Sequence, residues 1–529
     1  MPIPDRHAFR TAIEAARHHD QRTLAIPIVE QLLDDQLTPV LAYRRLVAPD
    51  ERTAPSFLLE SVEGGERQGR HSILSAQPAF ELTAKQGSVT ILDHLTGRHA
   101  TAVTHADPLS IPRERLGHIR LIVPRGVPSL PLLGGWVGYV AYDAVRYAEP
   151  DKLPFASAPR DDRTLPDVDL AFYDNVVVFD HVDKLVNVVQ IALIGPRDDI
   201  ESAYATAVAR LEQRITALQR HSKPLASGRV GVQPAAAPLP SNITRERHAE
   251  MVARALEYIR AGDIFQVVLG QRFEHASTAD PFDVYRALRV VNPSPYMVYL
   301  QSQGCILIAS SPEILCRVRR HDDRLVVTNR PLAGTRPRGR TPEADLAMER
   351  ELLADPKERA EHAMLVDLGR NDVGQVAIPG SINLPRIMDI ERYSHVMHIS
   401  STITGTMRPG LDAWDALRAA LPVGTISGAP KIRAMQIIDE LEPVQRGPYG
   451  GGVGYVGLDG QMDIALTLRT IVAPTHLADG GRWIYHLQAS GGIVADSVAD
   501  AEFQETVNKA AALARAIHLA ETAFTASLV

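Results

Sequence analysis

Two pairs of glutamates stand three residues apart in segments whose composition favours helices. Glu358 and Glu361 lie in the run KERAEHAMLVD, and Glu502 and Glu505 lie in AEFQETVNK, which ends at Lys509. Because residues three or four apart share a helix face, each pair points the same way. Carboxylates on two helices suit Mg²⁺ and leave coordination positions for water and an anionic substrate. On spacing alone, a solvated helix face is the commoner explanation.

A run of small residues, LPVGTISGAPK, leads directly into a predicted helix. With Pro430 suited to the first turn, this segment presents backbone amides and the hydroxyls of Thr425 and Ser427, which are groups that bind carboxylates. It is not a phosphate-binding loop, because only three residues separate Gly424 from Gly428 and no Gly-Lys-Ser/Thr follows. An ordinary helix-entry loop explains the same residues equally well.

A glycine-rich run, GGGVGYVGLDG, contains a formal match to the dinucleotide fingerprint. An Asp459-Gly460 turn and another strand follow it instead of a helix, so a dinucleotide site is not supported. Glycine-rich edge strands that admit a ligand or another backbone are the better interpretation. Arg469, in the apolar run ALTLRTIV, indicates a buried acidic partner from the protein or from a ligand. His398, judged alone, is typical of a core histidine.

Composition restricts the class of protein. The 529 residues are 45% hydrophobic and 22% charged, with a mean hydropathy of −0.08 and a formal net charge of −7. These values indicate a soluble globular chain, and without basic stripes we expect no nucleic-acid partner. Neither an export segment in 1–10 nor a run of about 18 apolar residues occurs, so we expect no membrane association and a cytoplasmic location. Cys305 and Cys316 lie in apolar runs, which predicts buried thiols in a reducing compartment.

The chain changes character at a segment rich in serine, proline and alanine. A charged helical pattern ends near residue 220 and is followed by HSKPLASGR and PAAAPLP, which predicts an N-terminal region 1–220, a linker 221–243 and a C-terminal region 244–520. Alternating segments on both sides predict an α plus β protein with largely antiparallel sheets. The similar runs GGWVGYV and GGVGYV, one in each region, are too short to establish a repeat.

These elements must position the chemistry. The expected helices span 204–220, 244–260, 283–290, 346–372, 412–421 and 429–441. The expected strands span 87–92, 135–140, 176–182, 267–273, 297–300, 306–310, 453–456, 465–472 and 484–489. Arg469 would therefore lie inside a strand.

Several runs, taken in order, resemble those of the chorismate-utilising enzymes. They are GDIFQVVL from 262, SPE from 311, RPLAGTRPRG from 330, EHAMLVDLGRND from 361 and GTISGAPK from 424. The resemblance covers about 243–516, and a weaker one runs through SFLLES and GGWVGY in the N-terminal region. It implies an α/β fold of two layered, largely antiparallel sheets with outer helices, and an active site in the cleft between the layers.

Two positions within that resemblance distinguish the reactions of the family. Members that add water to chorismate carry a lysine base where this chain has Gln266, and glutamine suits ammonia, which is already a nucleophile. Members that make aminodeoxychorismate carry a nucleophilic lysine where this chain has Ala333. The resemblance therefore implies an anthranilate synthase large subunit, a lyase in tryptophan biosynthesis that converts chorismate and ammonia to anthranilate and pyruvate. The alternatives are an aminodeoxychorismate synthase large subunit and a catalytically silent paralogue.

The resemblance also implies ligands for a metal and a substrate. Glu361 and Glu505 would bind Mg²⁺, with Glu358 and Glu502 supporting them. The residues implied in substrate binding are Gly334, Thr335, Tyr449, Arg469, Ser490, Gly491, Gly492 and Lys509.

The implied catalytic residues are His398, Gln266 and Thr425. His398 would take the ring proton during pyruvate loss, a step that restores aromaticity. In one place the sequence departs from the family, which usually reads QAGAGIVADS where this chain has QASGGIVADS. Small residues remain there, so we expect the close backbone approach to be kept.

Such a subunit implies partners. Neither cysteine has the setting of an amidotransferase nucleophile, so ammonia would come from a separate glutamine amidotransferase subunit in a hetero-oligomer. The runs LLES from 58 and NPSPYM from 292 resemble two sides of the L-tryptophan pocket of feedback-regulated relatives, which implies an allosteric site at Ser61, Pro295, Tyr296 and Met297. Either run also suits plain structure, as a core strand or as a rigid turn.

Overall fold

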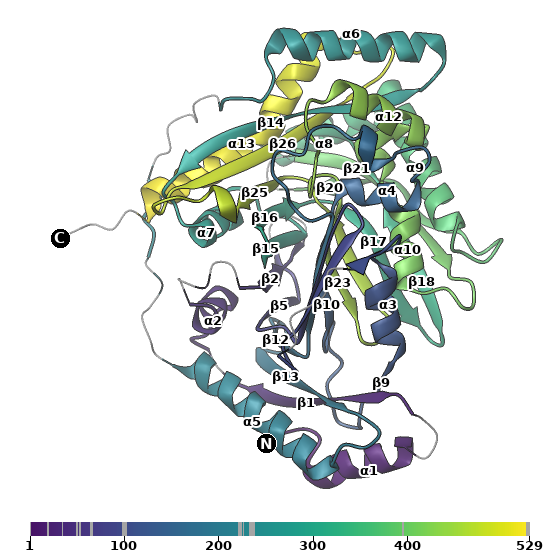
Figure 1. Cartoon of the computed structure of the whole chain (residues 1–529). Coiled ribbons are helices and arrows are strands. Elements are labelled where there is room, and N and C mark those ends of the chain that lie inside the picture. The colour runs from purple at the N-terminus through teal and green to yellow at the C-terminus, as the bar shows by residue number, and fades with distance from the viewer. Residues whose placement is uncertain are drawn as a thin grey trace.

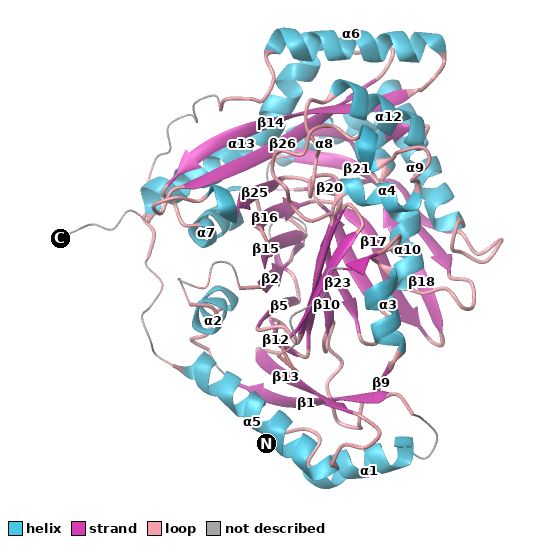
Figure 2. Ribbon diagram, in the orientation of Figure 1, coloured by secondary structure: helices cyan, strands magenta, loops and turns pink. Residues whose placement is uncertain are grey.

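The computed structural model describes the chain except for residues 1, 18–20, 34, 49–50, 52–53, 64–66, 98–102, 221–224, 226, 232–238, 394–395 and 525–529. Two large sheets lie face to face with helices outside them (Figures 1 and 2). This arrangement confirms the predicted fold class. Parts of the predicted linker 221–243 lie outside the described residues, and both sheets contain strands from either side of it.

The first sheet has 12 strands. In sheet order they are β22 (Gly428–Ala429), β14 (Gln266–Ser277), β26 (Trp483–Ile493), β25 (Thr470–Pro474), β16 (Cys305–Ser311), β15 (Tyr296–Ser302), β2 (Ser56–Glu60), β5 (His71–Ala76), β12 (Asn175–Asp180), β13 (Leu185–Ile194), β1 (Thr23–Leu32) and β9 (Ile119–Leu121). The described pairs are antiparallel except for β1 with β9.

The second sheet also has 12 strands. In sheet order they are β19 (Leu332–Pro337), β21 (Val396–Thr406), β18 (Arg324–Arg330), β17 (Ile314–His321), β24 (Met462–Leu466), β23 (Gly452–Gly457), β10 (Gly135–Val140), β11 (Val168–Tyr173), β6 (Phe80–Lys85), β7 (Ser88–Asp93) and β8 (Val103–Thr104), with β20 (Asn383–Arg392) also paired to β21. Two short strands, β3 (Val62–Glu63) and β4 (Arg67–Gln68), pair separately.

Apolar side chains from both sheets form one core between them. Phe57 and Leu307 of the first sheet lie in the same buried cluster as Val137 and Tyr455 of the second. Helices bury the outer faces, which explains why strands facing a layer on each side are apolar throughout. Cys305 and Cys316 are both buried free thiols, as predicted.

The helices fall into two groups according to the sheet they cover. Against the first sheet lie α1 (Arg6–Arg17), α2 (Pro39–Leu46), α5 (Ile200–Gln219), α6 (Arg245–Ala261), α7 (Pro281–Val291), α12 (Lys431–Leu441) and α13 (Ala499–Ala523). Against the second lie α3 (Ser110–Gly117), α4 (Val145–Ala148), α8 (Pro342–Ala354), α9 (Pro356–Gly374), α10 (Ala413–Ala420) and the short α11 (Gly424–Ser427). The described part of the chain also contains three single 3₁₀ turns: η1 (Tyr142–Ala144), η2 (Phe155–Ser157) and η3 (Thr475–Leu477).

The two halves of the chain share one topology. Outward from the central β2–β15 pair, the first sheet runs β5, β12, β13, β1 on one side and β16, β25, β26, β14 on the other. Outward from β10–β23, the second runs β11, β6, β7 and β24, β17, β18. Corresponding strands follow the same order along the chain, and α5 lies beside β13 as α13 lies beside β26 (Figure 1). The fold therefore contains the repeat that the two similar glycine runs were too short to establish.

Those glycine runs lie where the halves meet. Gly138 of β10 is opposite Gly454 of β23. A Cβ on Gly138 would lie 2.0 Å from the carbonyl oxygen of Asp169, and one on Gly454 would lie 2.1 Å from that of Asp463. The predicted close approach of another backbone is therefore correct. The predicted edge position is wrong, because β10 and β23 are central strands.

Two predicted elements are each divided in the structure. The helix expected over 346–372 ends at Ala354, because Asp355 caps a new helix that begins at Pro356. The strand expected over 465–472 is two strands, β24 and β25, which belong to different sheets. Arg469 lies at the crossing between them with a positive φ of 46°. The prediction that Arg469 lies within a strand is therefore wrong.

Candidate active site

The crossings between the two sheets bring together an arginine and a histidine. Arg469 Nη2 lies 3.5 Å from His398 Nε2 on β21. His398 Nδ1 lies 2.8 Å from the carbonyl oxygen of Gly334 and 3.1 Å from Thr335 Oγ1. Because a carbonyl only accepts, Nδ1 carries the proton and Nε2 keeps its lone pair. Burial and the nearby Arg469 charge lower the pKa of His398 to about 4, so the imidazole is neutral at physiological pH.

Arg469 makes no ion pair with any carboxylate of the described residues. Burial lowers its pKa, while the neighbouring Tyr393 and Glu313 raise it. The sequence left open a carboxylate of the protein or of a ligand as the partner, and no protein carboxylate of the described residues lies at bonding distance. A buried guanidinium without an ion pair is suited to bind the carboxylate of a substrate.

Glu313 is an acid that sequence reasoning did not single out. It lies at the crossing from β16 to β17, is 4% exposed, and accepts a hydrogen bond of 3.1 Å from Thr425 Oγ1. Burial raises its pKa to about 8, so the carboxyl group carries a proton at neutral pH. The SPE run was visible in the sequence, but burial is a tertiary property.

Of the two predicted hydroxyls of the 424–427 segment, only that of Thr425 bonds to another residue of the site. This segment is the short helix α11, and Ser427 Oγ donates to the carbonyl of Val423 at 2.8 Å. Pro430 occupies the cap position and the following helix begins at Lys431. Thr425 therefore remains the candidate, bonded to Glu313.

A second side of the site is formed by β26 and α13. Lys509 Nζ donates to the carbonyl of Ser490 at 2.8 Å and pairs with Glu505 at 2.7 Å. Tyr449 is buried against Ser490. Ser490 Oγ is buried and meets no partner at full hydrogen-bond geometry, with Tyr449 as its nearest polar neighbour.

The ammonia-selecting candidate Gln266 lies beside the predicted metal ligands. Its Nε2 donates to Glu361 Oε1 at 2.9 Å, while its own Oε1 is buried without a partner. A Cβ on Gly492 would lie 2.7 Å from Gln266 Nε2. A side chain at position 492 would therefore displace the Gln266 amide from its present place.

Four carboxylates from α9 and α13 face each other. Burial raises the pKa of Glu361, and the charges of Glu358 and Glu505 raise it further. Glu502 Oε2 is buried without a partner, and burial raises the pKa of that carboxyl as well. Gly334 and Gly491 contact this group, since a Cβ on either would lie 3.1 Å from a carboxylate oxygen of Glu358 or Glu502.

This donor set fits Mg²⁺ in its chemistry. Its donors are oxygens only, and one of them is buried and unsatisfied. Among the described residues, no three His, Cys, Asp or Glu side chains form a ready metal cage. Two carboxylates, one from each helix, with water and substrate as the other ligands, match the usual coordination of Mg²⁺.

A buried ion pair holds the segment that carries Tyr449. Arg446 donates to Glu442 at 2.9 Å, to the Ile426 carbonyl at 2.7 Å and to the Val268 carbonyl at 2.6 Å. It thereby ties α12 to α11 and β14, which carry Thr425 and Gln266. Sequence reasoning missed this pair: its two residues are only four apart, but their burial and the distant carbonyls that Arg446 reaches are tertiary features.

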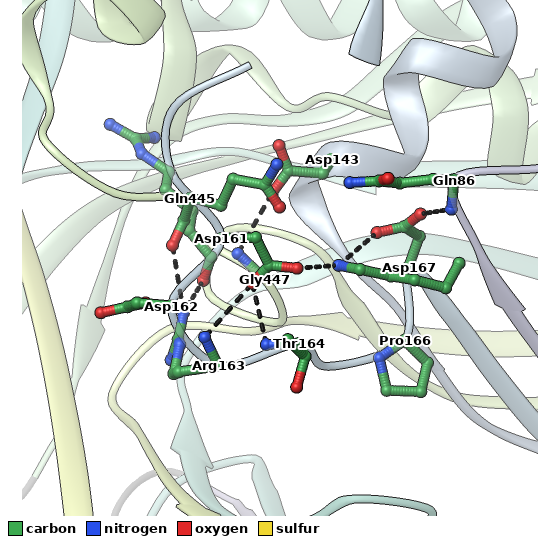
Figure 3. A network of polar contacts seen from close by, with 12 residues as sticks. Gln86, Asp143, Asp161, Asp162, Arg163, Thr164, Pro166, Asp167, Gln445 and Gly447 are labelled. Atoms are coloured by element: carbon green, nitrogen blue, oxygen red, sulfur yellow. Dashed lines mark hydrogen bonds and ion pairs between the residues drawn. The ribbon is translucent and has the colours of Figure 1, made fainter. Parts of the chain in front are cut away.

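A neighbouring network fixes the same segment from the N-terminal half. Arg163 Nη2 donates to the carbonyls of Gln445 at 3.2 Å and Arg446 at 2.8 Å. Asp143 accepts from the amide of Gly447 at 3.2 Å (Figure 3). The N-terminal half therefore supports a site whose side chains come from the C-terminal half.

Comparisons with known proteins agree with this geometry. The sequence model of the family described as chorismate binding enzyme matches residues 54–515. The anthranilate synthase alpha subunit 1, chloroplastic, of Arabidopsis thaliana is 52% identical over 522 residues, which cover 95% of this chain and 87% of that protein. Anthranilate synthase component 1 of Pseudomonas aeruginosa is 46% identical over 506 residues, 94% of this chain and 96% of that protein.

The chain belongs to the chorismate-binding enzyme family. This confirms the resemblance drawn from the sequence runs. Among solved structures, the chorismate-binding enzyme is similar to anthranilate synthase component I from Streptococcus pneumoniae TIGR4, with a TM-score of 0.70 and 36% identity over 84% of this chain and 92% of that one. The menaquinone-specific isochorismate synthase from Escherichia coli, 19% identical with a TM-score of 0.64 over 96% and 99% of the chains, shares the fold.

The enzyme has a separate cavity at the predicted allosteric position. Ser61, Pro295, Tyr296 and Met297 line one space of about 220 Å³. It lies at the β2–β15 junction and is also lined by Asp463 of the second sheet. The structure thus brings the four predicted residues together.

The carboxylates beside that cavity already form hydrogen bonds and ion pairs with other residues of the protein. The Glu60 carboxylate accepts from Tyr285 at 2.6 Å and pairs with Arg289 at 2.8 Å, so it is not free for a ligand ammonium. Asp463 pairs with Arg317 and Arg319.

None of the described helices of this chorismate-binding enzyme is long and apolar enough to cross a membrane. The cytoplasmic location stays a prediction.

Proposed function

We propose that this enzyme is the large subunit of an anthranilate synthase, which converts chorismate and ammonia to anthranilate, pyruvate and water. The observation that carries the proposal is Gln266, whose amide donates to Glu361 while its Oε1 is left without a partner. An amide cannot deprotonate water, but a free carbonyl oxygen can accept a hydrogen bond from ammonia. Ala333 lies on β19 and offers no nucleophile for the covalent route to aminodeoxychorismate.

The side chains divide the reaction between them. Arg469 and Tyr449 would hold the enolpyruvyl carboxylate, with Lys509 adding positive charge near Ser490. Ammonia adds to the ring carbon beside the carboxylate-bearing carbon, and the ring hydroxyl leaves as water with a proton from Glu313. His398 Nε2 then takes the proton from the aminated carbon as pyruvate departs. His398 is a weak base, but the restored aromaticity drives that step, and a bound carboxylate would offset the Arg469 charge.

Mg²⁺ bound by Glu361 and Glu505, with Glu358 and Glu502 supporting them, would neutralise the ring carboxylate. The buried unsatisfied oxygen of Glu502 and the mutual repulsion of these carboxylates support this assignment.

The experiment is to mix the purified chain with chorismate, MgCl₂ and either an ammonium salt or glutamine, and to identify the product. We expect anthranilate with ammonium and no turnover with glutamine, because ammonia would come from a separate amidotransferase subunit. 4-Amino-4-deoxychorismate, isochorismate or no product with ammonium would overturn the proposal. Turnover of glutamine by the pure chain would overturn the separate partner.

Two substitutions test the choice of reaction. Ala333→Lys is expected to divert product to the 4-amino compound or to trap a covalent adduct, because it introduces the missing nucleophile. Gln266→Lys is expected to admit some water addition, because lysine can act as a base. Products and adducts are followed by chromatography and intact-protein mass spectrometry. Anthranilate as the sole product of both variants, without an adduct, contradicts these roles.

The rate is expected to depend on the Glu313 proton. With a pKa of about 8, Glu313 is protonated below that value, so the rate at a fixed concentration of free ammonia should fall as pH rises through 8. Glu313→Gln should lower kcat by roughly 10²–10⁴ and abolish this alkaline fall. Glu313 also makes the free energy of unfolding depend on pH. Its pKa in the folded protein exceeds its pKa in the unfolded chain, so its contribution to that free energy is complete below the unfolded pKa and is lost as pH rises through 8. If Glu313→Gln turned over at the wild-type rate, Glu313 would not be the proton donor.

We also propose that L-tryptophan binds the cavity at Ser61, Pro295, Tyr296 and Met297 and inhibits the enzyme. The cavity joins the two halves, so a ligand there favours one arrangement of them, and inhibition follows if that arrangement binds chorismate less tightly.

Ser61→Phe is expected to fill this cavity and to abolish tryptophan sensitivity while turnover persists. Inhibition curves at several chorismate concentrations measure the effect. A wild type indifferent to millimolar tryptophan would remove the regulatory proposal and leave the catalytic one.

A further inference from the structure

The N-terminal half contains a cavity at the place that corresponds to the active site. In the C-terminal half, Glu313 and Arg469 lie at the β16–β17 and β24–β25 crossings. The corresponding crossings of the N-terminal half are β5–β6, with Pro78, and β11–β12, with Asp174. Both border a cavity of about 430 Å³, which α5 closes as α13 borders the active site. This volume is within the range of small-molecule sites.

The chemistry of this cavity differs from that of the active site. Two arginines of α5, Arg210 and Arg214, line it together with the single carboxylate of Asp174. Asp174 accepts from Arg210 at 3.2 Å and from Asn175 Nδ2 at 3.1 Å. Two guanidinium groups against one carboxylate leave the cavity positively charged.

Arg214 is the unsatisfied group. Its Nη1 is buried and has no hydrogen-bond partner. Burial lowers its pKa to about 10, which leaves it charged at neutral pH. The Asp174 carboxylate is engaged by Arg210 and Asn175, and although its charge also acts on Arg214, no carboxylate of the described residues forms an ion pair with Arg214. A buried charge without a partner is costly, and proteins usually pair such groups.

The other lining residues indicate the chemistry of the uncharged part of a ligand. Leu46, Ala76, Pro78 and Leu95 are apolar lining residues. The other titratable group of the lining, His94, pairs with Glu81 at 2.6 Å. The amide side chains of Gln77, Gln190 and Gln213 complete the walls. One net positive charge beside these mixed walls suits a single anionic group on a small body with both apolar and polar surface.

We propose that this cavity is a second binding site, for a small organic monocarboxylate whose carboxylate pairs with Arg214. The site is distinct from the active site and does not depend on the reaction proposed above. It is lined from the N-terminal half and lies at the position that the internal repeat makes equivalent to the active site.

The test uses the full chain crystallised with 4-iodobenzoate, because anomalous scattering from iodine locates the ligand. We expect an iodine peak in the cavity with the carboxylate on Arg214. Arg214→Gln should remove that peak and weaken the corresponding calorimetric binding step about tenfold or more. Any peak at Arg469 should remain in this variant and disappear in Arg469→Gln. Iodine found only outside the cavity, or an unchanged peak in Arg214→Gln, would overturn the proposal.

A matched control and a stability measurement separate binding from structure. Glu212→Gln changes an exposed residue of the same helix by one charge and should leave binding unchanged. Without ligand, Arg214→Gln should keep or raise the melting temperature, because its buried Nη1 makes no hydrogen bond. A fall of several degrees would show that Arg214 is structural and would overturn its role as a ligand anchor. Inorganic phosphate serves as the second probe, and phosphate binding tighter than 4-iodobenzoate would overturn the monocarboxylate class.

Discussion

A chain carrying Arg469→Gln is expected to lose about 10²–10³ in kcat/KM for chorismate, or roughly 3–4 kcal/mol. Arg469 lies at the crossing between β24 and β25, beside His398 and Glu313, and forms no ion pair with a described carboxylate. A substrate carboxylate would therefore be its charge partner. Removing the guanidinium removes that pairing from both ground and transition states, so the loss should appear mainly in KM.

Two controls sharpen this measurement. Arg469→Lys keeps the charge without the planar fork and should lose less activity than Arg469→Gln. Arg386→Gln removes an exposed arginine of β20, 67% accessible, and should leave the kinetics unchanged. Because the Arg469 charge helps to hold the pKa of His398 down, that pKa should rise in Arg469→Gln when followed by NMR. An unchanged KM together with an unchanged His398 titration refutes the assignment.

Replacing Arg446 by methionine is expected to lower the free energy of unfolding by about 3–5 kcal/mol, because it leaves a buried carboxylate without its partner. The side chains of Arg446 and Glu442 are 1% and 2% exposed. Glu442 also accepts from the amide of Gly270 at 2.8 Å, so the pair joins β14 to α12. Urea denaturation measures the loss.

The double variant Arg446→Met/Glu442→Leu should recover part of this loss, since no charge remains buried without a partner. Arg254→Met breaks a surface pair with Glu257, whose side chains are 49% and 58% exposed, and should cost no more than about 1 kcal/mol. If the Arg446 variant lost as little as the surface variant, the pair would not hold the site together.

Much of the site was accessible from local sequence. Glu358 with Glu361, and Glu502 with Glu505, share helix faces through their spacing alone, and the structure places them on α9 and α13. The strand patterns gave β10 its bounds, because alternation and turn residues are local properties. The resemblance of ordered runs supplied the family, which the comparisons bear out.

Other features depended on long-range contacts. The strand predicted over 465–472 is continuous in hydropathy, and only the change of sheet at 467–469 shows that Arg469 faces the site. Glu313 is an ordinary glutamate in sequence, and only its burial raises its pKa. The burial of Arg446 and its bonds to the carbonyls of Ile426 and Val268 were equally hidden in the sequence.

The sequence by itself determined the helix faces, most strand positions and the family of this chain, since all of these depend on neighbours along the backbone. The tertiary structure alone decided that α9 and α13, from opposite sheets, bring their carboxylates together and that Arg469 and Asp174 lie at corresponding crossings of the two halves. The physical reason is that burial and charge pairing depend on which segments meet in space. Residues such as Gly138 and Gly454, which lie more than 300 positions apart, can be seen to face each other only once the strands are paired.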